Sequence, residues 1–302
     1  MKKWTTADMP SQQGRSAVVT GTGGLGYEDA LALAKAGADV TIAGRNPKKG
    51  AEAVAKIREA APGAIVRFED LDLASLQSVR AFGERMLAER QSLDILINNA
   101  GVMVPPQRQE TADGFELQFG TNYLGHFALT AQLMPLLRKG RNPRVVTVSS
   151  VAARQGQIDF DDLQTNDYRA MVAYGQSKLA CLMFAQELQR RSEASGWGIT
   201  SIAAHPGVAA TELLHNGPGR WSGTSIARTL FWFMFQPVWQ GALPTLYAAT
   251  DPAALPGGYY GPHALGEIRG YPVPARVPAA ADDRAVSERL WGVSEELTGV
   301  RF

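Results

Sequence analysis

The chain has 302 residues, of which 45% are hydrophobic, and a formal net charge of +1 at pH 7. This length can bury a large core, in one large α/β domain or in two smaller ones. Because 30 Lys and Arg residues nearly balance 29 Asp and Glu residues, the charge gives no support for a nucleic-acid partner or an anionic membrane surface. A small-molecule partner is expected instead.

The single cysteine and the first residues indicate the compartment. Cys181 lies in an apolar, helix-like run and has no second cysteine to pair with, so it is expected to be a core residue in a reducing environment. The first ten residues carry basic side chains without an apolar stretch behind them, so they do not resemble a secretory signal. The sequence therefore predicts a cytoplasmic protein.

Short runs of branched residues alternate with longer helical stretches from the N-terminal end onward. The first strand is predicted at 16–20, followed by a glycine-rich turn and a helix over 25–36. A second strand follows at 39–43, and Asn46 is the expected N-cap of a helix over 47–60 that begins with proline. These elements form a βαβ unit.

Four further strands are predicted in runs rich in branched residues, separated by long amphipathic helices. They lie at 64–68, 93–97, 144–148 and 199–203. Strands that alternate with helices predict a parallel sheet covered on both faces. No linker-like segment interrupts the series, so we expect a single doubly wound, Rossmann-type α/β domain over residues 1–302.

The turn after the first strand has the composition of a phosphate-binding loop. It reads Thr-Gly-Thr-Gly-Gly-Leu-Gly over 20–26 and contains the pattern Gly-x-Gly-x-x-Gly. Glycines let the backbone approach a pyrophosphate, and the N-terminus of the following helix stabilises its charge. We therefore predict that the cofactor is bound by Gly21, Gly23, Gly24, Leu25 and Gly26.

The end of the second strand discriminates between NADP and NAD. An acidic residue there would accept a hydrogen bond from the ribose of NAD, but this chain has Arg45. A guanidinium matches a phosphate with two parallel hydrogen bonds, so Arg45 favours the 2′-phosphate of NADP. A surface arginine beside a helix start is the alternative interpretation.

Tyr174 and Lys178 lie one helical turn apart, downstream of a predicted strand that ends before Ser149 and Ser150. Residues four apart share a helix face, so the ammonium of Lys178 can stabilise the phenolate of Tyr174 and make the phenol a stronger acid. Tyr174 could then exchange a proton with a substrate at neutral pH. A solvated helix pair without a chemical role is the alternative.

The order and spacing of these motifs resemble the short-chain dehydrogenase/reductase family over nearly the whole chain. Its catalytic positions match Asn122, Ser150, Tyr174 and Lys178, with Ser149 as the alternative serine. Its remaining cofactor positions, at the adenine, in an Asn-Asn-Ala-Gly segment and at the nicotinamide, match Asp72 with Leu73, Asn99 with Ala100 and Gly101, and Pro206 with Gly207, Val208 and Thr211.

Within the family, the run from Gln157 to Leu163 and the segment around Tyr174 look most like the retinol dehydrogenase and protochlorophyllide reductase group. Members of that group handle bulky lipophilic carbonyls or rings and generally prefer NADP. The resemblance implies an oxidoreductase that transfers a hydride between NADP(H) or NAD(H) and a lipophilic alcohol or carbonyl. Homo-oligomers are common in the family.

The resemblance also implies a role for each catalytic residue. Tyr174 is the general acid in reduction and the general base in oxidation, and Ser150 donates a hydrogen bond to the substrate oxygen. Lys178 makes Tyr174 more acidic and holds the nicotinamide ribose. Asn122 bends its helix and positions a water that relays protons through Lys178.

One departure from the family concerns the glycine loop, which is one residue shorter between Gly21 and Gly24 than the family pattern. An alternative function follows from it. The chain could be a dinucleotide-binding sensor or interaction protein whose shortened loop has weakened or removed catalysis. A test of cofactor binding separates the two hypotheses.

Other segments carry weaker signals. The four histidines, His126, His205, His215 and His263, lack metal-binding spacing, so no metal is expected. The variable region 212–250 is predicted to be a substrate lid and includes the most apolar stretch, at 229–239. For that stretch a lid is favoured, then a subunit interface, then an interfacial membrane contact; it is too short for a membrane span.

Overall fold

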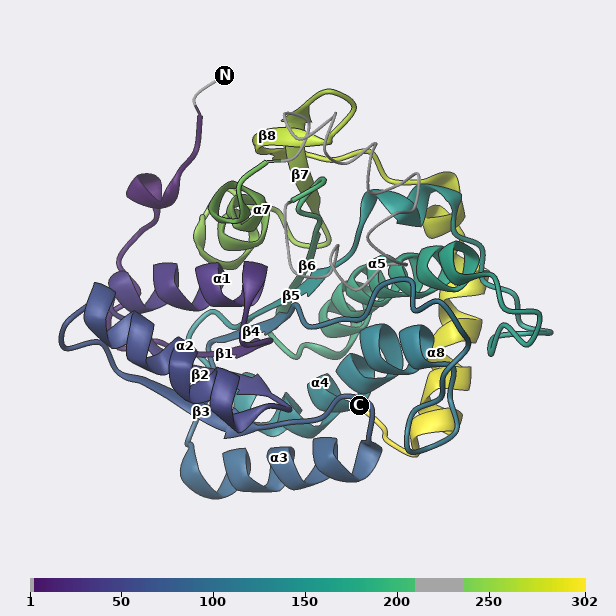
Figure 1. The fold of residues 1–302 in the computed structure, drawn as a ribbon, viewed down its shortest axis with the longest axis horizontal. Helices are drawn as coiled ribbons and strands as arrows, with labels where there is room; N and C mark the ends of the chain where they lie inside the picture. Colours follow the sequence, from purple (N-terminus) through teal and green to yellow (C-terminus); the bar gives the residue numbers. More distant parts are fainter. Residues whose placement is uncertain (1–2, 210–235) are drawn as a thin grey trace.

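The computed structural model describes residues 3–209 and 236–302 (Figure 1). Within these residues, eight strands form one sheet in the order β3-β2-β1-β4-β5-β6-β7-β8. Strands β1 to β7 run parallel to their neighbours, and β8 pairs antiparallel with β7 at the edge. The predicted doubly wound Rossmann-type fold is confirmed.

The six predicted strands are all present, with ends within two residues of the predicted ones. The strands are β1 (Ser16–Thr20), β2 (Asp39–Gly44), β3 (Val66–Asp70), β4 (Ile95–Asn98), β5 (Arg144–Val148), β6 (Thr200–Ala204), β7 (Tyr259–Ala264) and β8 (Arg269–Pro274). The last two were not predicted from the sequence. Both contain proline, which lacks the ladder N–H and is tolerated at sheet edges, so the sequence pattern there does not resemble a strand.

Helices cover both faces of the sheet. One face is covered by α1 (Gly24–Lys35), α2 (Pro47–Ala60) and α7 (Val238–Thr250), and the other by α3 (Leu76–Glu89), α4 (Gly125–Leu137) and α5 (Ala170–Ser195). Helix α8 (Arg284–Thr298) packs against α5, outside the sheet layer (Figure 1). Two apolar cores result, one on each side of the sheet.

The parallel register brings the predicted site residues to one edge of the sheet. Thr20 pairs with Ala43 at the ends of β1 and β2, and Val148 pairs with Ala204 at the ends of β5 and β6. The loops that follow these strands therefore leave the sheet side by side. In open α/β sheets, ligands bind at this carboxyl edge, where the strand order reverses.

The predicted lid, 212–250, is covered only in part. Residues 212–235 lie outside the described residues, and so does most of the apolar stretch 229–239. The last thirteen residues of the region form α7, which contacts α1 and the strands of the sheet. Helix α7 is part of the layer that covers the sheet. The lid hypothesis therefore applies to the residues of the region that precede α7.

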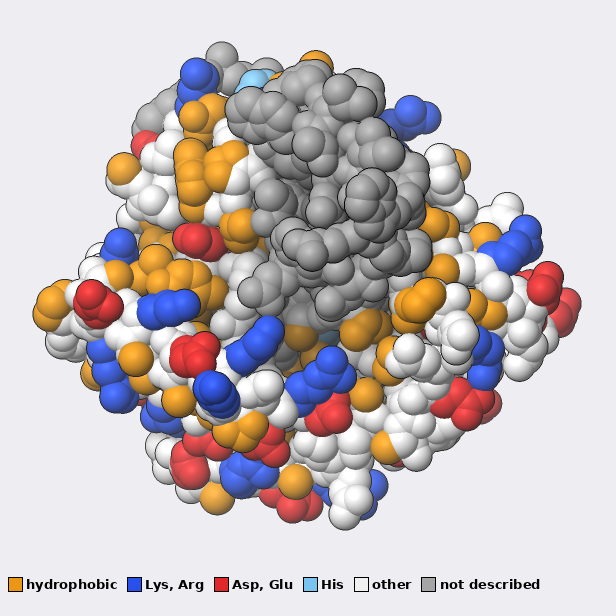
Figure 2. Space-filling model, viewed as in Figure 1, with side chains coloured by type: hydrophobic (Ala, Val, Ile, Leu, Met, Phe, Trp, Pro, Cys, Tyr) orange, Lys and Arg blue, Asp and Glu red, His pale blue; other side chains and the backbone are white. Residues whose placement is uncertain are grey.

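The surface is mixed in charge on the face shown in Figure 2, where Lys and Arg side chains alternate with Asp and Glu. This agrees with the near-zero net charge. Within residues 3–209 and 236–302, no helix is both long enough and apolar enough to cross a membrane.

Asp29 is an ionisable group in the interior, on the buried side of α1. The side chain is fully buried, and neither carboxyl oxygen has a hydrogen-bond partner among the described residues. Burial, with a smaller contribution from Glu28, raises the pKa of Asp29 well above its ordinary value. Between the ordinary and the raised pKa, the folded state therefore keeps the Asp29 carboxyl protonated, whereas the unfolded chain releases this proton.

This proton makes the stability of the fold depend on pH. The free energy of unfolding falls as pH rises from the ordinary aspartate pKa of about 4 to the raised pKa of Asp29. The fall is about 1.4 kcal/mol for each pH unit between these two pKa values. We expect Asp29→Asn to flatten this slope and to stabilise the fold at pH 8 relative to the native chain. Urea unfolding between pH 5 and pH 9 measures it. Glu52→Gln, on the exposed side of α2, is the control, and an unchanged slope in Asp29→Asn contradicts the assignment.

Candidate active site

The glycine loop forms a close-packed turn between β1 and α1. Gly21 has a positive φ of 104°, and a Cβ on Gly26 would lie 2.6 Å from the Gly21 carbonyl oxygen. The loop also packs on Asn99, whose Nδ2 donates to Thr20 O at 2.8 Å. Although it is one residue short, the loop therefore has the strand-turn-helix geometry of a phosphate-binding site.

Among the described residues, the start of α1 has open space beside Gly23. Gly23 is the N-cap in an extended conformation and provides no side-chain cap, so the first N–H groups of the helix receive no capping bond. A Cβ on Gly23 would meet no atom of the described residues within 4 Å. Backbone donors and open space are what a pyrophosphate requires.

The predicted adenosine side is formed by the residues after β2 and β3. Arg45 is exposed directly after β2, and the methyl group of Thr22 lies against Gly44, so the glycine loop approaches this strand end. Asp72 is half-buried, and its Oδ1 accepts a hydrogen bond from Ala74 N at 3.0 Å. Leu73 is buried beside it.

The segment after β4 connects the glycine loop to the predicted catalytic residues. The backbone N–H groups of Asn99 and Ala100 both donate to Thr20 Oγ1 at 2.9 Å. A Cβ on Gly101 would lie 2.9 Å from Asn122 Oδ1 and 3.7 Å from Lys178 Nζ. Glycine at 101 therefore allows the backbone to lie beside both side chains.

Tyr174 and Lys178 lie on α5 at the carboxyl edge of the sheet. They are 8% and 6% exposed, so the pair is not a solvated helix face. Lys178 Nζ donates to Val148 O at 2.9 Å and lies 6.0 Å from the centroid of the Tyr174 ring. The low exposure strengthens the electrostatic effect of the ammonium on its surroundings.

The two serines after β5 make different hydrogen bonds. Ser149 is buried and its hydroxyl donates to Lys178 O at 2.7 Å, which commits it to the α5 backbone. Ser150 Oγ accepts from Ala152 N at 3.2 Å, at the start of the short helix η3 (Val151–Gln155). Among the described residues no acceptor takes the hydroxyl hydrogen of Ser150, so this hydrogen can be donated to a substrate oxygen.

Asn122 lies in a π-helical segment, η2 (Phe119–Leu124), immediately before α4. Its side chain accepts from Val102 N at 2.7 Å and donates to Ser177 Oγ at 3.0 Å. Its carbonyl oxygen accepts from His126 Nδ1 at 2.9 Å and from Cys181 Sγ at 3.2 Å. A relay water on this carbonyl would have to compete with those two donors.

His126 is a buried histidine for which no role was predicted from the sequence. Because its Nδ1 faces a carbonyl, that nitrogen carries the proton, and Nε2 accepts from Thr20 Oγ1 at 3.0 Å. Burial, together with nearby Lys178, lowers the pKa of His126 to about 4, so the ring is neutral at neutral pH. The imidazole thus joins the end of β1 to Asn122; its spacing of four from Asn122 was the available signal.

The loop after β6 contains the segment predicted to face the nicotinamide. Gly207 has a positive φ of 64° and donates its N–H to His205 Nδ1 at 3.2 Å. His205 is fully buried and its Nε2 lies 2.9 Å from Glu267 Oε2, a partner that the sequence did not indicate. Burial lowers the pKa of His205, and both of its ring nitrogens have hydrogen-bond partners. Thr211 lies outside the described residues.

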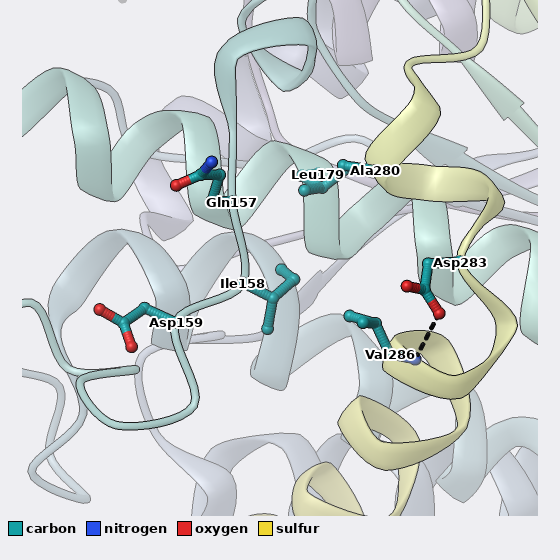
Figure 3. Close-up of a pocket in the computed structure, with 7 residues that line it drawn as sticks. All are labelled: Gln157, Ile158, Asp159, Leu179, Ala280, Asp283 and Val286. Atoms are coloured by element: carbon teal, nitrogen blue, oxygen red, sulfur yellow. Dashed lines mark hydrogen bonds between the residues drawn. The ribbon is translucent and has the colours of Figure 1, made fainter.

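A surface pocket of about 390 Å³ lies elsewhere (Figure 3). It is formed by the segment after η3, by α5 and by the start of α8, and its lining residues are Gln157, Ile158, Asp159, Leu179, Ala280, Asp283 and Val286. Asp283 is engaged as the N-cap of α8 through a hydrogen bond from Val286 N. Because no predicted catalytic or cofactor residue lines it, we do not assign it to the active site.

Over residues 3–209 and 236–302, no cluster of three or more His, Cys, Asp or Glu side chains has the arrangement of a metal site. His215 lies outside these ranges. Cys181 is a buried free thiol, and burial raises its pKa, so it is not a thiolate nucleophile at neutral pH.

A doubly wound sheet with a glycine loop and a buried Tyr-Lys pair at its carboxyl edge defines a dinucleotide-dependent oxidoreductase. The family model for short chain dehydrogenases matches residues 15–218. The chain belongs to this family and is an NAD(P)-dependent oxidoreductase.

Curated relatives match over nearly the full chain. Retinol dehydrogenase 12 of Mus musculus is 41% identical over 297 residues, covering 96% of this chain and 88% of the relative. Polyprenol dehydrogenase of Mus musculus is also 41% identical, covering 96% and 86%. The sequence-based likeness to the retinol dehydrogenase group is thereby confirmed.

Solved structures share the fold. An uncharacterised protein from Mycobacterium paratuberculosis matches with a TM-score of 0.83 and 38% identity, covering 100% of this chain and 99% of that one. The RhlG protein of Pseudomonas aeruginosa, solved with NADP, matches with a TM-score of 0.66 and 24% identity, covering 82% and 94%. The second similarity concerns the fold alone.

Proposed function

We propose that this oxidoreductase transfers a hydride between NADP(H) and a lipophilic alcohol or carbonyl compound, with Tyr174 as general acid and base. The observation that carries the proposal is the convergence of Tyr174, Lys178 and Ser150 at the carboxyl edge of the sheet. All three lie beside loops that fit a dinucleotide. Together they supply a proton donor, a cation and an oxygen-binding hydroxyl, a combination that suits hydride chemistry.

The residues proposed to bind the cofactor follow it from the adenosine through the pyrophosphate to the nicotinamide. The uncapped first turn of α1 and the space that the described residues leave around Gly23 suit the pyrophosphate. Arg45, Asp72 and Leu73 are proposed to hold the adenosine half. Asn99, Ala100 and Gly101, with Pro206, Gly207 and Val208, are proposed to hold the nicotinamide half, and Thr211 is proposed to join them.

When bound, the nicotinamide supplies or accepts the hydride. Tyr174 donates its hydroxyl proton to the carbonyl oxygen during reduction and takes it back during oxidation. Ser150 donates its free hydroxyl hydrogen to the same oxygen and stabilises the charge that develops there. Lys178, anchored on Val148 O, lies beside the Tyr174 ring and is proposed to hold the nicotinamide ribose. Asn122 accepts a hydrogen bond from Val102 N and donates one to Val102 O, and so holds the backbone at Val102 in place.

Arg45 is proposed to select NADP over NAD through the 2′-phosphate. We expect Arg45→Ala to weaken NADPH binding by about tenfold, because an exposed charge-assisted contact contributes about 1–1.5 kcal/mol, and to leave NADH binding unchanged. Fluorescence titration with both nucleotides measures this. Lys48→Ala, which removes an exposed charge from the start of α2, is the matched control. Equal losses for both nucleotides contradict selection by Arg45.

A lipophilic substrate is supported by the names of the relatives, which are retinol and polyprenol dehydrogenases. Retinaldehyde, a long-chain prenyl aldehyde and a small polar aldehyde form a suitable panel with NADPH, followed by nicotinamide absorbance. Turnover of the first two at low concentration supports the proposal. Preference for the polar aldehyde overturns the lipophilic assignment.

We propose a cytoplasmic location from the single buried free cysteine.

A further inference from the structure

The turn between β7 and β8 packs directly on the loop after β6. Val208 N donates to Ile268 O at 2.8 Å. A Cβ on Gly207 would overlap the same carbonyl, so only glycine allows this approach of the two backbones. The turn has positive φ angles at Leu265, Gly266 and Glu267, which shows how sharply it folds back. The turn between β7 and β8 therefore supports the backbone of the loop that is proposed to face the nicotinamide.

The Glu267 carboxylate lies at the centre of this contact. Its Oε2 accepts the Nε2–H of His205 at 2.9 Å and lies 2.6 Å from Nη2 of Arg154. Its Oε1 accepts from Arg276 N at 3.0 Å. Because Gly207 N donates to His205 Nδ1, the imidazole proton is on Nε2 and points at the carboxylate. Both oxygens of Glu267 are therefore occupied.

Arg154 connects the same carboxylate to the catalytic serine. It belongs to η3, the short helix that begins directly after Ser150, and its Nη1 donates to Gly266 O at 3.1 Å. One side chain, Glu267, thus bonds the segment after Ser150 and the segment before Gly207. Partial burial acts to raise the pKa of Glu267, but hydrogen bonds from His205 and Arg276 and the charge of Arg154 bring it below its ordinary value. The group is a carboxylate at neutral pH.

We propose that Glu267 is a positioning residue for hydride transfer, which fixes the Pro206–Gly207 loop relative to Ser150 through His205 and Arg154. This inference rests on the proposed assignment of that loop to the nicotinamide. The loop proposed to hold the hydride-donating nicotinamide and the loop that carries the Ser150 hydroxyl are separate, and small misplacements between reacting groups cost large factors in rate. A charged link between these loops holds that geometry without touching the substrate.

The test is Glu267→Gln, which keeps the shape of the side chain and removes its charge. We expect NADPH to bind about tenfold more weakly, and kcat to fall at saturating NADPH, because charge-assisted bonds to two loops are weakened. The fragment 2′,5′-ADP, which lacks the nicotinamide, should bind as it does to the native chain. Calorimetric titration with each ligand and steady-state kinetics measure these effects, and the Tm reports folding. Glu295→Gln on α8, which loses the ion pair between Glu295 and Arg301, is the control.

Arg154→Met breaks the link from the other side and tests the same proposal without changing Glu267. It should reproduce the split between NADPH and 2′,5′-ADP, and the double variant should lose less than the product of the two single losses. Native NADPH binding and kcat in both variants overturn the inference. Equal weakening of NADPH and 2′,5′-ADP also overturns it, because the role is then general to the fold. If the native chain binds neither NADPH nor NADH, the proposed cofactor role itself fails.

Discussion

Tyr174→Phe should lower kcat by about 10²- to 10⁴-fold, the range that general acid–base catalysis contributes. The substitution removes one oxygen atom from a side chain that is 8% exposed, and among the described residues no hydrogen bond of that hydroxyl is lost. The affinity for NADPH should therefore remain within about twofold of the native value. Stopped-assay kinetics with retinaldehyde, together with fluorescence titration of NADPH, measure both quantities.

Tyr247→Phe is the matched control for this experiment. Tyr247 is a half-buried tyrosine on α7 that packs against Trp4 and Tyr260, away from the predicted catalytic residues. Its substitution removes the same hydroxyl group and should leave kcat unchanged. A Tyr174→Phe variant that keeps more than about a tenth of the native kcat would show that another group moves the proton.

Gly26→Ala should have the largest effect on the cofactor site. The added Cβ would lie 2.6 Å from Gly21 O and 3.1 Å from Thr20 O, both backbone atoms that cannot rotate away. The start of α1 must move, so we expect the free energy of unfolding to fall by about 1–3 kcal/mol and NADPH affinity to fall by more than about tenfold. Urea unfolding and NADPH titration measure the two effects.

Gly23→Ala is the control for this variant, because it removes a glycine from the same loop without crowding the loop backbone. Its Cβ would meet no atom of the part of the chain that the structure describes within 4 Å, and its extended conformation suits any residue. The stability of this variant should stay within about 0.5 kcal/mol of the native value. If Gly26→Ala unfolds at the native urea concentration and binds NADPH normally, the loop does not have the close-packed geometry on which the cofactor site depends.

The sequence predicted the central sheet because its strands are buried on both faces and read as continuous branched runs. Residues 144–148 were predicted and observed with the same bounds. The edge was missed because β7 and β8 contain Pro262, Pro272 and Pro274, whose missing N–H groups are tolerated only where one side of the ladder is open.

The candidate site was predicted where chemistry depends on residue type and spacing along one element. Tyr174 and Lys178 share one face of α5, and spacing alone indicates that. The choice between Ser149 and Ser150 rested on resemblance, and only the three-dimensional contacts distinguish a hydroxyl bonded to Lys178 O from one with a free hydrogen. Glu267 was missed because its partners lie 62 and 113 residues away, and no local pattern indicates such contacts.

The role of His126 also could not be predicted from the sequence alone. Its position four residues after Asn122 was visible, but a lone histidine in an apolar run gives no indication of whether it is a ligand, an acid or a structural residue. Its bonds to Asn122 O and Thr20 Oγ1 and its neutral state assign it a structural role between the glycine loop and the catalytic residues.

Transfer of deuterium from NADPH that carries two deuterium atoms at the reactive ring carbon tests hydride transfer most directly. The native chain is incubated with this cofactor and retinaldehyde, and mass spectrometry measures deuterium at the carbinol carbon of the product. We predict one deuterium per product molecule from the native chain, and product formation at least about 10²-fold slower from Tyr174→Phe. Alcohol formed without deuterium, or formed equally fast by Tyr174→Phe, would contradict hydride transfer at this site.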